Sequence, residues 1–146
     1  MSKKINVRFV ICFIFVMFLM GCINKVPNKF DLKQLTRIDI EEVKADGSYG
    51  ESLMITEEKT LEIIRKIFKQ IKWEPNVESK MAREKDIKAT LFYKYDENMP
   101  ERLFEYQIWF NQNNDTATII SNNEKEGYGN LDKENAQALE NILLNK

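Results

Sequence analysis

The chain has 146 residues, with 22 basic and 23 acidic side chains, two cysteines and no histidine. This length suits one ordinary domain with a hydrophobic core, and the nearly balanced charge argues against a nucleic-acid partner. The absence of histidine excludes serine and cysteine nucleophiles that histidine activates, and it removes the commonest zinc ligand. The composition therefore indicates a single domain without the catalytic groups of most hydrolases.

The N-terminal segment has the pattern of an export signal. Lys3, Lys4 and Arg8 are followed by an apolar run without charges over residues 9–20. A bilayer-spanning helix needs about 20 apolar residues, so the run is too short for an ordinary permanent span. A basic start followed by a short apolar run is typical of a secretory signal peptide. We therefore expect residues 1–21 to be removed on export.

The end of the apolar run, Leu19-Met20-Gly21-Cys22, resembles a bacterial lipobox, although Met20 is larger than the residue usually found there. The resemblance implies cleavage between Gly21 and Cys22 and a diacylglyceryl group on the sulfur of Cys22. The protein would then be a lipoprotein held on the extracytoplasmic face of the cell membrane. Residues 22–30 would form a lipidated tether that, fully extended, keeps the domain within about 25 Å of the bilayer. The alternative is an N-terminal helix retained in the membrane.

The first half of the predicted domain, residues 31–146, contains a hairpin and a helix. Apolar residues occur at 38, 40 and 43 and in a short run over 53–55, on either side of the turn Asp46-Gly47-Ser48. Apolar residues then recur at helical spacing over 61–71, and Trp73-Glu74-Pro75 ends the run. The pattern predicts two strands and one amphipathic helix.

The second half predicts a three-stranded meander and a terminal helix. Period-two alternation covers 87–95 and 102–110, and a Thr- and Ile-rich segment follows at 116–121. Asp132 is a candidate N-cap for the last helix. The predicted fold is α+β in the order β-β-α-β-β-β-α. An antiparallel sheet, made of the hairpin plus the three-stranded meander, would have both helices packed on one face.

Three further segments, at 71–75, 106–110 and 127–131, carry a second resemblance. Together with the lipobox, they are similar to small uncharacterised lipoproteins of Gram-positive bacteria, the YhfM-like type. The resemblance covers most of the predicted domain and includes no catalytic signature. It implies a membrane-tethered domain without assigned chemistry.

Large apolar side chains are expected on the face of the sheet away from the helices. If even-numbered residues of 102–110 face the helices, Leu103 and Trp109 face outward, as does Phe92 on the preceding strand. Aromatic rings among polar residues are typical of a protein-binding surface, so an envelope protein is the expected partner. Tyr128, between two glycines, is a second possible contact. The alternatives are that Phe92 and Trp109 lie under the 76–86 connection or a helix, and that Tyr128 packs locally.

Oxygen ligands in the chain do not predict a metal site. Asn111, Asn113 and Asp115 have the spacing of calcium ligands, but Thr116 stands where that loop needs glycine and Asn122 where it needs glutamate. A hairpin turn is therefore expected, with no metal and no cofactor.

Nearby carboxylates, Asp39 with Glu41 and Glu101 with Glu105, could in principle act as acid and base. Such pairs arise freely in a chain with 31% charged residues, so no catalytic residue is predicted. The expected function is that of a noncatalytic binding lipoprotein. The alternative is an envelope-associated accessory enzyme or enzyme inhibitor that uses Asp or Glu chemistry.

Overall fold

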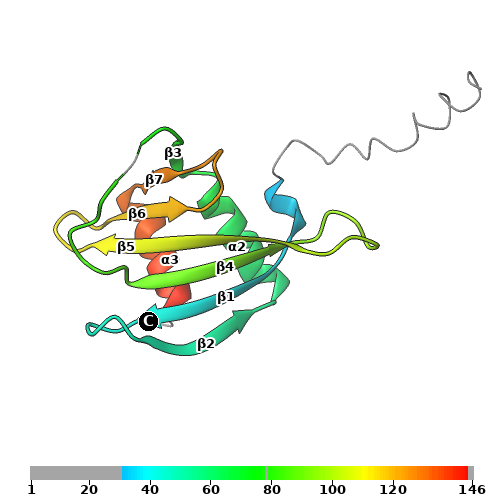
Figure 1. The fold of residues 1–146 in the computed structure, drawn as a ribbon, viewed down its shortest axis with the longest axis horizontal. Helices are drawn as coiled ribbons and strands as arrows, with labels where there is room; N and C mark the ends of the chain where they lie inside the picture. The colour runs from blue at the N-terminus through cyan, green and yellow to red at the C-terminus, as the bar shows by residue number, and fades with distance from the viewer. Residues whose placement is uncertain (1–30, 78, 145–146) are drawn as a thin grey trace, which may run out of the picture. The chain divides into compact units, whose positions relative to one another are not determined.

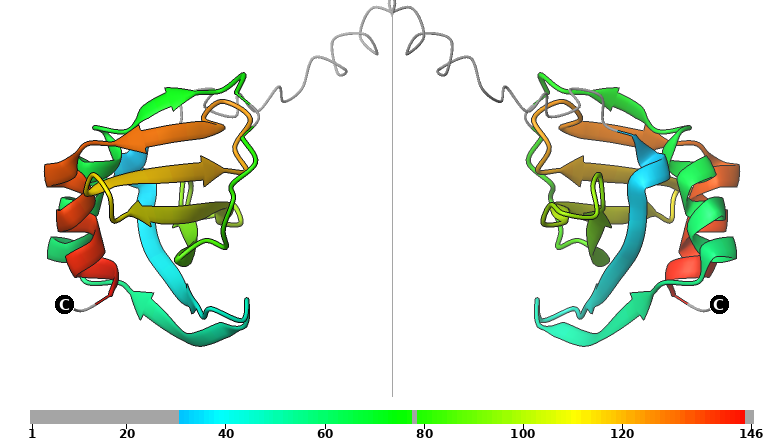
Figure 2. Two further views of the ribbon diagram at one scale, coloured as in Figure 1. Left: turned by 90° about the vertical axis from the view of Figure 1, so that its left-hand side faces the viewer. Right: turned by 90° about the vertical axis from the view of Figure 1, so that its right-hand side faces the viewer.

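Two helices lie on one face of a seven-stranded sheet in the computed structural model of the protein (Figure 1, Figure 2). The structure describes residues 31–77 and 79–144. The predictions for the signal peptide and the tether, including Gly21 and Cys22, lie outside these residues. All pairings between the named strands are antiparallel, so the predicted α+β class is confirmed.

The elements follow one another in a simple order along the chain. They are η1 (Leu32–Gln34), β1 (Leu35–Val43), β2 (Tyr49–Ile55), α2 (Glu58–Phe68), β3 (Lys72–Glu74), β4 (Ile87–Tyr93), β5 (Arg102–Asn111), β6 (Thr116–Ser121), β7 (Tyr128–Leu131) and α3 (Lys133–Leu143).

The strand order in the sheet is β2-β1-β4-β5-β6-β7-β3. The hairpin β1–β2 joins the meander β4–β5–β6 through the antiparallel pair β1–β4, in which Ile38 lies opposite Leu91. The short strands β3 and β7 differ from the prediction, in which Trp73-Glu74-Pro75 only ends a helix and Tyr128, between two glycines, belongs to no strand. They pair with each other, with Trp73 opposite Gly129. Three or four residues are too few to show a periodicity, and the pairing joins segments far apart in the chain. No local sequence pattern therefore predicts it.

The hydrophobic core lies between the helices and the sheet. Tyr106 and Ile108 of β5 are fully buried, and the Tyr106 ring lies 5.4 Å from the ring of Phe68 on α2. This confirms that even-numbered residues of β5 face the helices. Other core side chains with almost no exposure are Leu35, Ile38, Leu61, Ile64, Ile87, Leu91, Ile119, Leu131 and Leu139.

The apolar stripe and the N-cap predicted for the helices are also present in the structure. The buried residues of α2 are Leu61, Ile64, Ile67 and Phe68, which belong to the apolar stripe that predicted it. Asp132 caps α3, since its side chain accepts the N–H of Asn135 at 3.0 Å. Helix formation and helix packing therefore follow from the same spacing of apolar residues.

The connection between β3 and β4 covers Trp109 on the outer face of the sheet. The indole Nε1 donates a hydrogen bond to the carbonyl of Arg83 at 3.0 Å. The guanidinium of Arg83 donates to the carbonyl of Phe110 at 2.8 Å, and the carboxylate of Asp86 accepts the N–H of Phe110 at 2.6 Å. Trp109 is consequently only 4% exposed, as in the alternative that placed it under the 76–86 connection.

A basic side chain covers the second outward ring. The guanidinium carbon of Arg37 lies 3.6 Å from the centroid of the Phe92 ring, and Arg37 also forms an ion pair with Asp39 at 3.0 Å. Phe92 is buried at 8% exposure. The planar guanidinium combines an aromatic contact with a charge partner, so a ring on an otherwise polar face is shielded from water.

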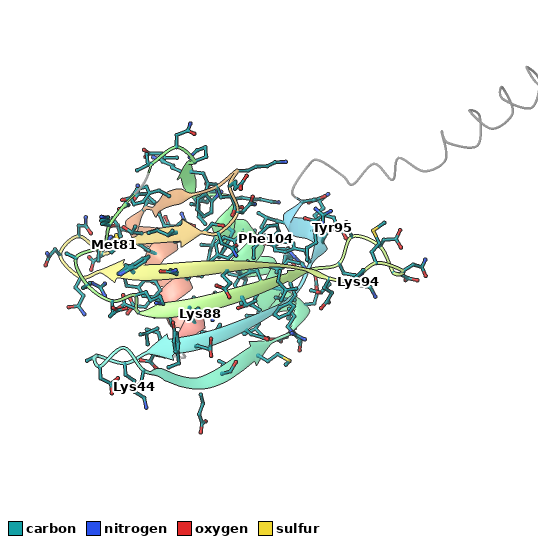
Figure 3. All side chains as sticks on the ribbon, in the orientation of Figure 1. Lys44, Met81, Lys88, Lys94, Tyr95 and Phe104 are labelled. Atoms are coloured by element: carbon teal, nitrogen blue, oxygen red, sulfur yellow. The ribbon has the colours of Figure 1, made fainter. Side chains whose placement is uncertain are left out.

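Charged side chains occupy the middle of the outer face. Lys88, labelled in Figure 3, is the second residue of β4 and lies 3.4 Å from a carboxylate oxygen of Glu41 and 3.7 Å from one of Glu105. Opposite charges at neighbouring cross-strand positions favour this strand register. The predicted surface of exposed aromatic rings is thus replaced by ion pairs with two covered rings.

Truncation of Trp109 should reveal its structural role. We expect Trp109→Ala to lower the free energy of unfolding by about 3–5 kcal/mol, because it removes a buried ring and an indole hydrogen bond. Leu103→Ala, on the same strand and face but 53% exposed, should cost less than about 1 kcal/mol. Urea denaturation of both variants tests this, and equal losses would show that Trp109 is not a core residue.

Candidate functional site

A buried carboxyl group lies on the helix-facing side of the sheet, where β6 ends. Oε2 of Glu126 accepts a hydrogen bond from Oγ of Ser121 at 2.7 Å and another from the hydroxyl of Tyr106 at 2.8 Å. Glu126 and Ser121 are each 7% exposed, and Tyr106 is fully buried. Ser121 and Tyr106 are cross-strand partners of β6 and β5, so strand register brings the two hydroxyls together.

The turn between β6 and β7 carries Glu126 inward. Asn122 fixes the start of the turn, because its N–H donates to the carbonyl of Glu105 at 3.0 Å and its side chain accepts the N–H of Glu105 at 2.9 Å. Gly127 ends the turn with a φ of 64°, a left-handed conformation that favours glycine. A Cβ at Gly127 would lie 3.0 Å from Cα of Pro75, so this position also needs the smallest residue.

Aromatic rings surround the phenol side of the site. The Tyr106 ring packs edge-on against Phe68 at 5.4 Å and lies 6.2 Å from Trp73. The hydroxyl of Tyr93 interacts with that of Tyr106. Burial raises the pKa of both tyrosines, so both phenols stay protonated and Tyr106 is a hydrogen-bond donor to Glu126.

Burial also raises the pKa of Glu126 above its ordinary value of 4.5. Hydrogen bonds from Ser121, Tyr106 and Asn123 stabilise the carboxylate and oppose that rise, but the loss of hydration outweighs them. A carboxyl group whose pKa is shifted toward neutrality is a better proton acceptor near neutral pH than an ordinary glutamate. Perturbed acidity in contact with a hydroxyl group is a recognised indication of a reactive site.

The three side chains form a hydroxyl–carboxyl–phenol arrangement. Ser121 supplies a possible nucleophile, Glu126 a base within hydrogen-bond reach, and Tyr106 a third group that orients the base. Nucleophile, base and orienting group in mutual contact are the general signature of an activated nucleophile. A carboxylate here occupies the place that histidine takes in most serine hydrolases, so a chain without histidine still has a base for the serine.

The four residues predicted to contact a partner do not form one surface. Phe92 and Leu103 are cross-strand neighbours on the outer face, but only Leu103, at 53%, is strongly exposed. Trp109 is covered at the other end of β5. Tyr128 is partly exposed and belongs to β7, where it lies opposite Glu74 of β3.

The carboxylates considered in the sequence are engaged elsewhere. Asp39 pairs with Arg37, while Glu41 and Glu105 share Lys88. None of them lies in the buried cluster. Glu101 accepts a hydrogen bond from the hydroxyl of Thr36 at 3.1 Å. Their role in the described structure is to neutralise and align neighbouring side chains on the outer face.

A polar cleft of about 270 Å³ lies at the opposite end of the sheet from Glu126, between strand ends and α3. Its carboxylates are Glu42, Asp86, Asp115 and Glu140. Arg83 binds Asp86, and Lys133 binds Asp115. Nowhere in residues 31–77 and 79–144 do three His, Cys, Asp or Glu side chains gather as a metal site would require. Asn111, considered as a calcium ligand, instead donates to Thr116 at 3.1 Å.

Sequence reasoning missed Glu126, although one signal pointed to a buried polar partner. The alternation of 102–110 places Tyr106 in the core, and a buried tyrosine hydroxyl usually needs a hydrogen-bond partner. The identity of that partner has no local signature, because Glu126 lies in a turn without periodicity. Its position depends on how the turn folds over the end of β5.

Comparison with solved structures gives one informative similarity. The fold resembles that of a thioesterase-like protein from Clostridium sporogenes ATCC 15579, with a TM-score of 0.53 and 21% sequence identity. The match covers 80% of this chain and 100% of the other. No protein-family model matches the chain, and the curated proteins contain no match to it. At this level of identity, the similarity establishes the fold.

The similarity corrects the expectation that the protein is not an enzyme. That expectation depended on the absence of histidine and of a catalytic signature. The same architecture occurs in a protein described as thioesterase-like, so the fold is compatible with catalysis. The Ser121–Glu126 contact places a hydroxyl group beside a buried carboxyl group in a chain without histidine.

The raised pKa of Glu126 predicts a pH dependence of stability. At a pH between 4.5 and the folded-state pKa, the unfolded chain has released a proton that the folded chain keeps. The free energy of unfolding should therefore fall as pH rises through this window and then level off. Glu126→Gln should lack this contribution. The free energy of unfolding of the natural chain, measured relative to that of the variant, should therefore fall with rising pH.

Urea denaturation of both proteins from about pH 4 to about pH 8 measures this difference. The contributions of the other carboxyl groups are the same in both proteins, so they cancel in the difference. Glu124→Gln, an exposed residue of the same turn, is the control and should follow the natural chain. Parallel profiles for the natural chain and Glu126→Gln would contradict a raised pKa.

Proposed function

We propose that the protein is a lipid-anchored, extracytoplasmic enzyme that hydrolyses acyl esters or thioesters through a serine–carboxyl pair. The observation that carries the proposal is the 2.7 Å hydrogen bond from Oγ of Ser121 to the buried carboxyl of Glu126. Similarity of fold to a thioesterase-like protein supports this class of substrate. The proposal takes up the enzyme alternative that uses Asp or Glu chemistry.

The reaction assigns one role to each side chain. Ser121 Oγ forms a bond to the acyl carbonyl carbon as its proton passes to Glu126, and the leaving thiol or alcohol then takes that proton. Water attacks the resulting acyl-serine, gives a proton to Glu126 and releases the carboxylic acid as the proton returns to Ser121. Tyr106 donates to the same carboxylate oxygen and keeps it directed at the serine.

Access to the pair depends on the turn over it. Ser121 and Glu126 each keep only 7% exposure, so a substrate reaches them when residues 122–127 move aside. Exclusion of water in the closed state strengthens the interaction between serine and carboxylate.

The membrane part of the proposal rests on the lipobox at Leu19–Cys22. A diacylglyceryl group on Cys22 supplies two acyl chains, which hold a protein stably at a bilayer. Within the part of the chain that the structure describes, no helix has the length and apolarity needed to span a membrane. Substrates and partners of the proposed lipoprotein are accordingly components of the cell envelope, close to the outer surface of the membrane.

Hydrolysis by the full chain in detergent micelles tests the catalytic part. p-Nitrophenyl butyrate and butyryl-coenzyme A provide an ester and a thioester. We expect release of the alcohol or thiol, with losses of at least about 100-fold in Ser121→Ala and Glu126→Gln. Glu124→Gln should retain activity, and thermal unfolding should show all variants folded. Activity unchanged in Glu126→Gln, or none in the natural chain, refutes the proposal.

Acyl-lipid labelling in cells tests the anchor separately. Cys22→Ser should abolish incorporation of an alkyne-bearing fatty acid, because the sulfur that accepts the diacylglyceryl group is lost. Cys12→Ser, which alters the cysteine inside the predicted signal peptide, should label normally. Continued labelling of Cys22→Ser would refute the lipobox assignment.

A further inference from the structure

The start of the described domain lies beside the hairpin between β4 and β5. Asp31 is the first described residue and follows directly on the proposed tether, residues 22–30. The carbonyl of Gln34 accepts the N–H of Lys94 at 2.9 Å. The hydroxyl of Tyr95 interacts with the backbone of Asp31. Lys94 and Tyr95 are labelled in Figure 3 at the base of this hairpin, so the tether joins the domain there.

The turn over the candidate site lies at the same end of the sheet. Asn122, which starts the β6–β7 turn, exchanges two hydrogen bonds with Glu105, near the start of β5, at 2.9 and 3.0 Å. β5 begins at Arg102, directly after the hairpin. We call this the tether end, made of η1, the hairpin 94–101 and the turn 122–127. The β5–β6 turn and the polar cleft lie at the opposite end.

The hairpin projects from the tether end with apolar side chains exposed (Figure 1). Residues 96–103 are all exposed. Among them, Met99 is 43% and Leu103 is 53% exposed, and Pro100 follows Met99. Apolar groups that gather on an exposed surface mark contact sites for proteins or membranes. The place where the tether joins the domain favours a membrane.

Charges around the hairpin nearly balance. In residues 31–34 and 94–102, the exposed cations are Lys33, Lys94 and Arg102, and the exposed anions are Asp31, Asp96, Glu97 and Glu101. Several of them have local contacts. Asp96 accepts the N–H of Asn98 at 2.8 Å, and the guanidinium carbon of Arg102 lies 5.3 Å from the ring centroid of Tyr95. Attraction to lipid would therefore come from the apolar groups rather than from net charge.

We propose that the tether end of the domain rests on the lipid bilayer, with Met99 and Leu103 in contact with lipid. The inference rests on the lipid anchor of the proposed function. Two partly exposed apolar side chains would hold a free protein at a bilayer only weakly. An acyl anchor on Cys22 makes the same contact intramolecular, at an effective concentration of about a millimolar, so a weak contact is sufficient. In this orientation, the turn over Ser121 faces the lipid.

Photo-crosslinking in membranes of cells that produce the full chain tests the contact. Asn98→p-benzoylphenylalanine places a photoreactive group beside Met99. Asn113→p-benzoylphenylalanine places the same group in the β5–β6 turn at the opposite end, and both positions are exposed. After illumination, mass spectrometry of the purified chain counts phospholipid adducts. We expect at least about fivefold more from position 98 than from position 113, corresponding to a preference of about 1 kcal/mol.

A charge at the lipid contact should weaken it. Leu103→Asp should lower the adduct yield from position 98 by at least about fivefold, because the contact would then take a carboxylate out of water. Gln107→Asp is the matched control, since Gln107 is exposed on the same strand and face but farther from the hairpin. It should leave the yield unchanged. Thermal unfolding should show both variants folded.

Three results would each overturn the proposal. They are equal phospholipid adducts from positions 98 and 113, adducts from position 98 with proteins in place of phospholipids, and a yield that Leu103→Asp leaves unchanged. The cross-link requires no hydrolysis, so Ser121→Ala should give the same adducts whether or not the catalytic proposal holds. Acyl-lipid labelling of Cys22→Ser reports on the anchor alone, so a failure of the bilayer contact is distinct from a failure of the anchor.

Discussion

The burial of Tyr106 is the constraint on which the rest of this structure depends. Its ring packs against Phe68 of α2 and Trp73 of β3, so it holds a helix and the far edge of the sheet against the centre of β5. Its hydroxyl cannot remain without a partner in that position. Glu126 meets this need from the β6–β7 turn, with its carboxyl group in the core. Packing of the core thus creates the polar cluster.

The two faces of the sheet shield their apolar side chains from water in different ways. On one face, the helices cover aliphatic and aromatic side chains. On the other, a polar connection covers Trp109 and a guanidinium covers Phe92. Arg83 and Asp86 hold that connection through three hydrogen bonds with Trp109 and Phe110 of β5. A face that is rich in aromatic residues in the sequence is therefore mostly ionic at its surface.

In the proposed mechanism, the buried carboxyl of Glu126 takes the place that histidine has in most serine hydrolases. A carboxylate in water is too weak a base to activate a hydroxyl group effectively. Removal from water raises the pKa of Glu126, and hydrogen bonds from two hydroxyl groups direct the carboxylate at Ser121. The same burial leaves Ser121 and Glu126 almost inaccessible to solvent.

The sequence by itself determined the α+β class, the helix stripes, the Asp132 cap and the inward direction of Tyr106, because these follow from spacing along one segment. The resemblance of Leu19-Met20-Gly21-Cys22 to a lipobox is the basis for the proposed anchor at Cys22. Only the tertiary structure decided that β3 pairs with β7, that the 76–86 connection covers Trp109, and that Glu126 contacts Ser121. Each of these contacts joins segments far apart in the chain. A turn without periodicity has no local sequence pattern that predicts where its side chains lie.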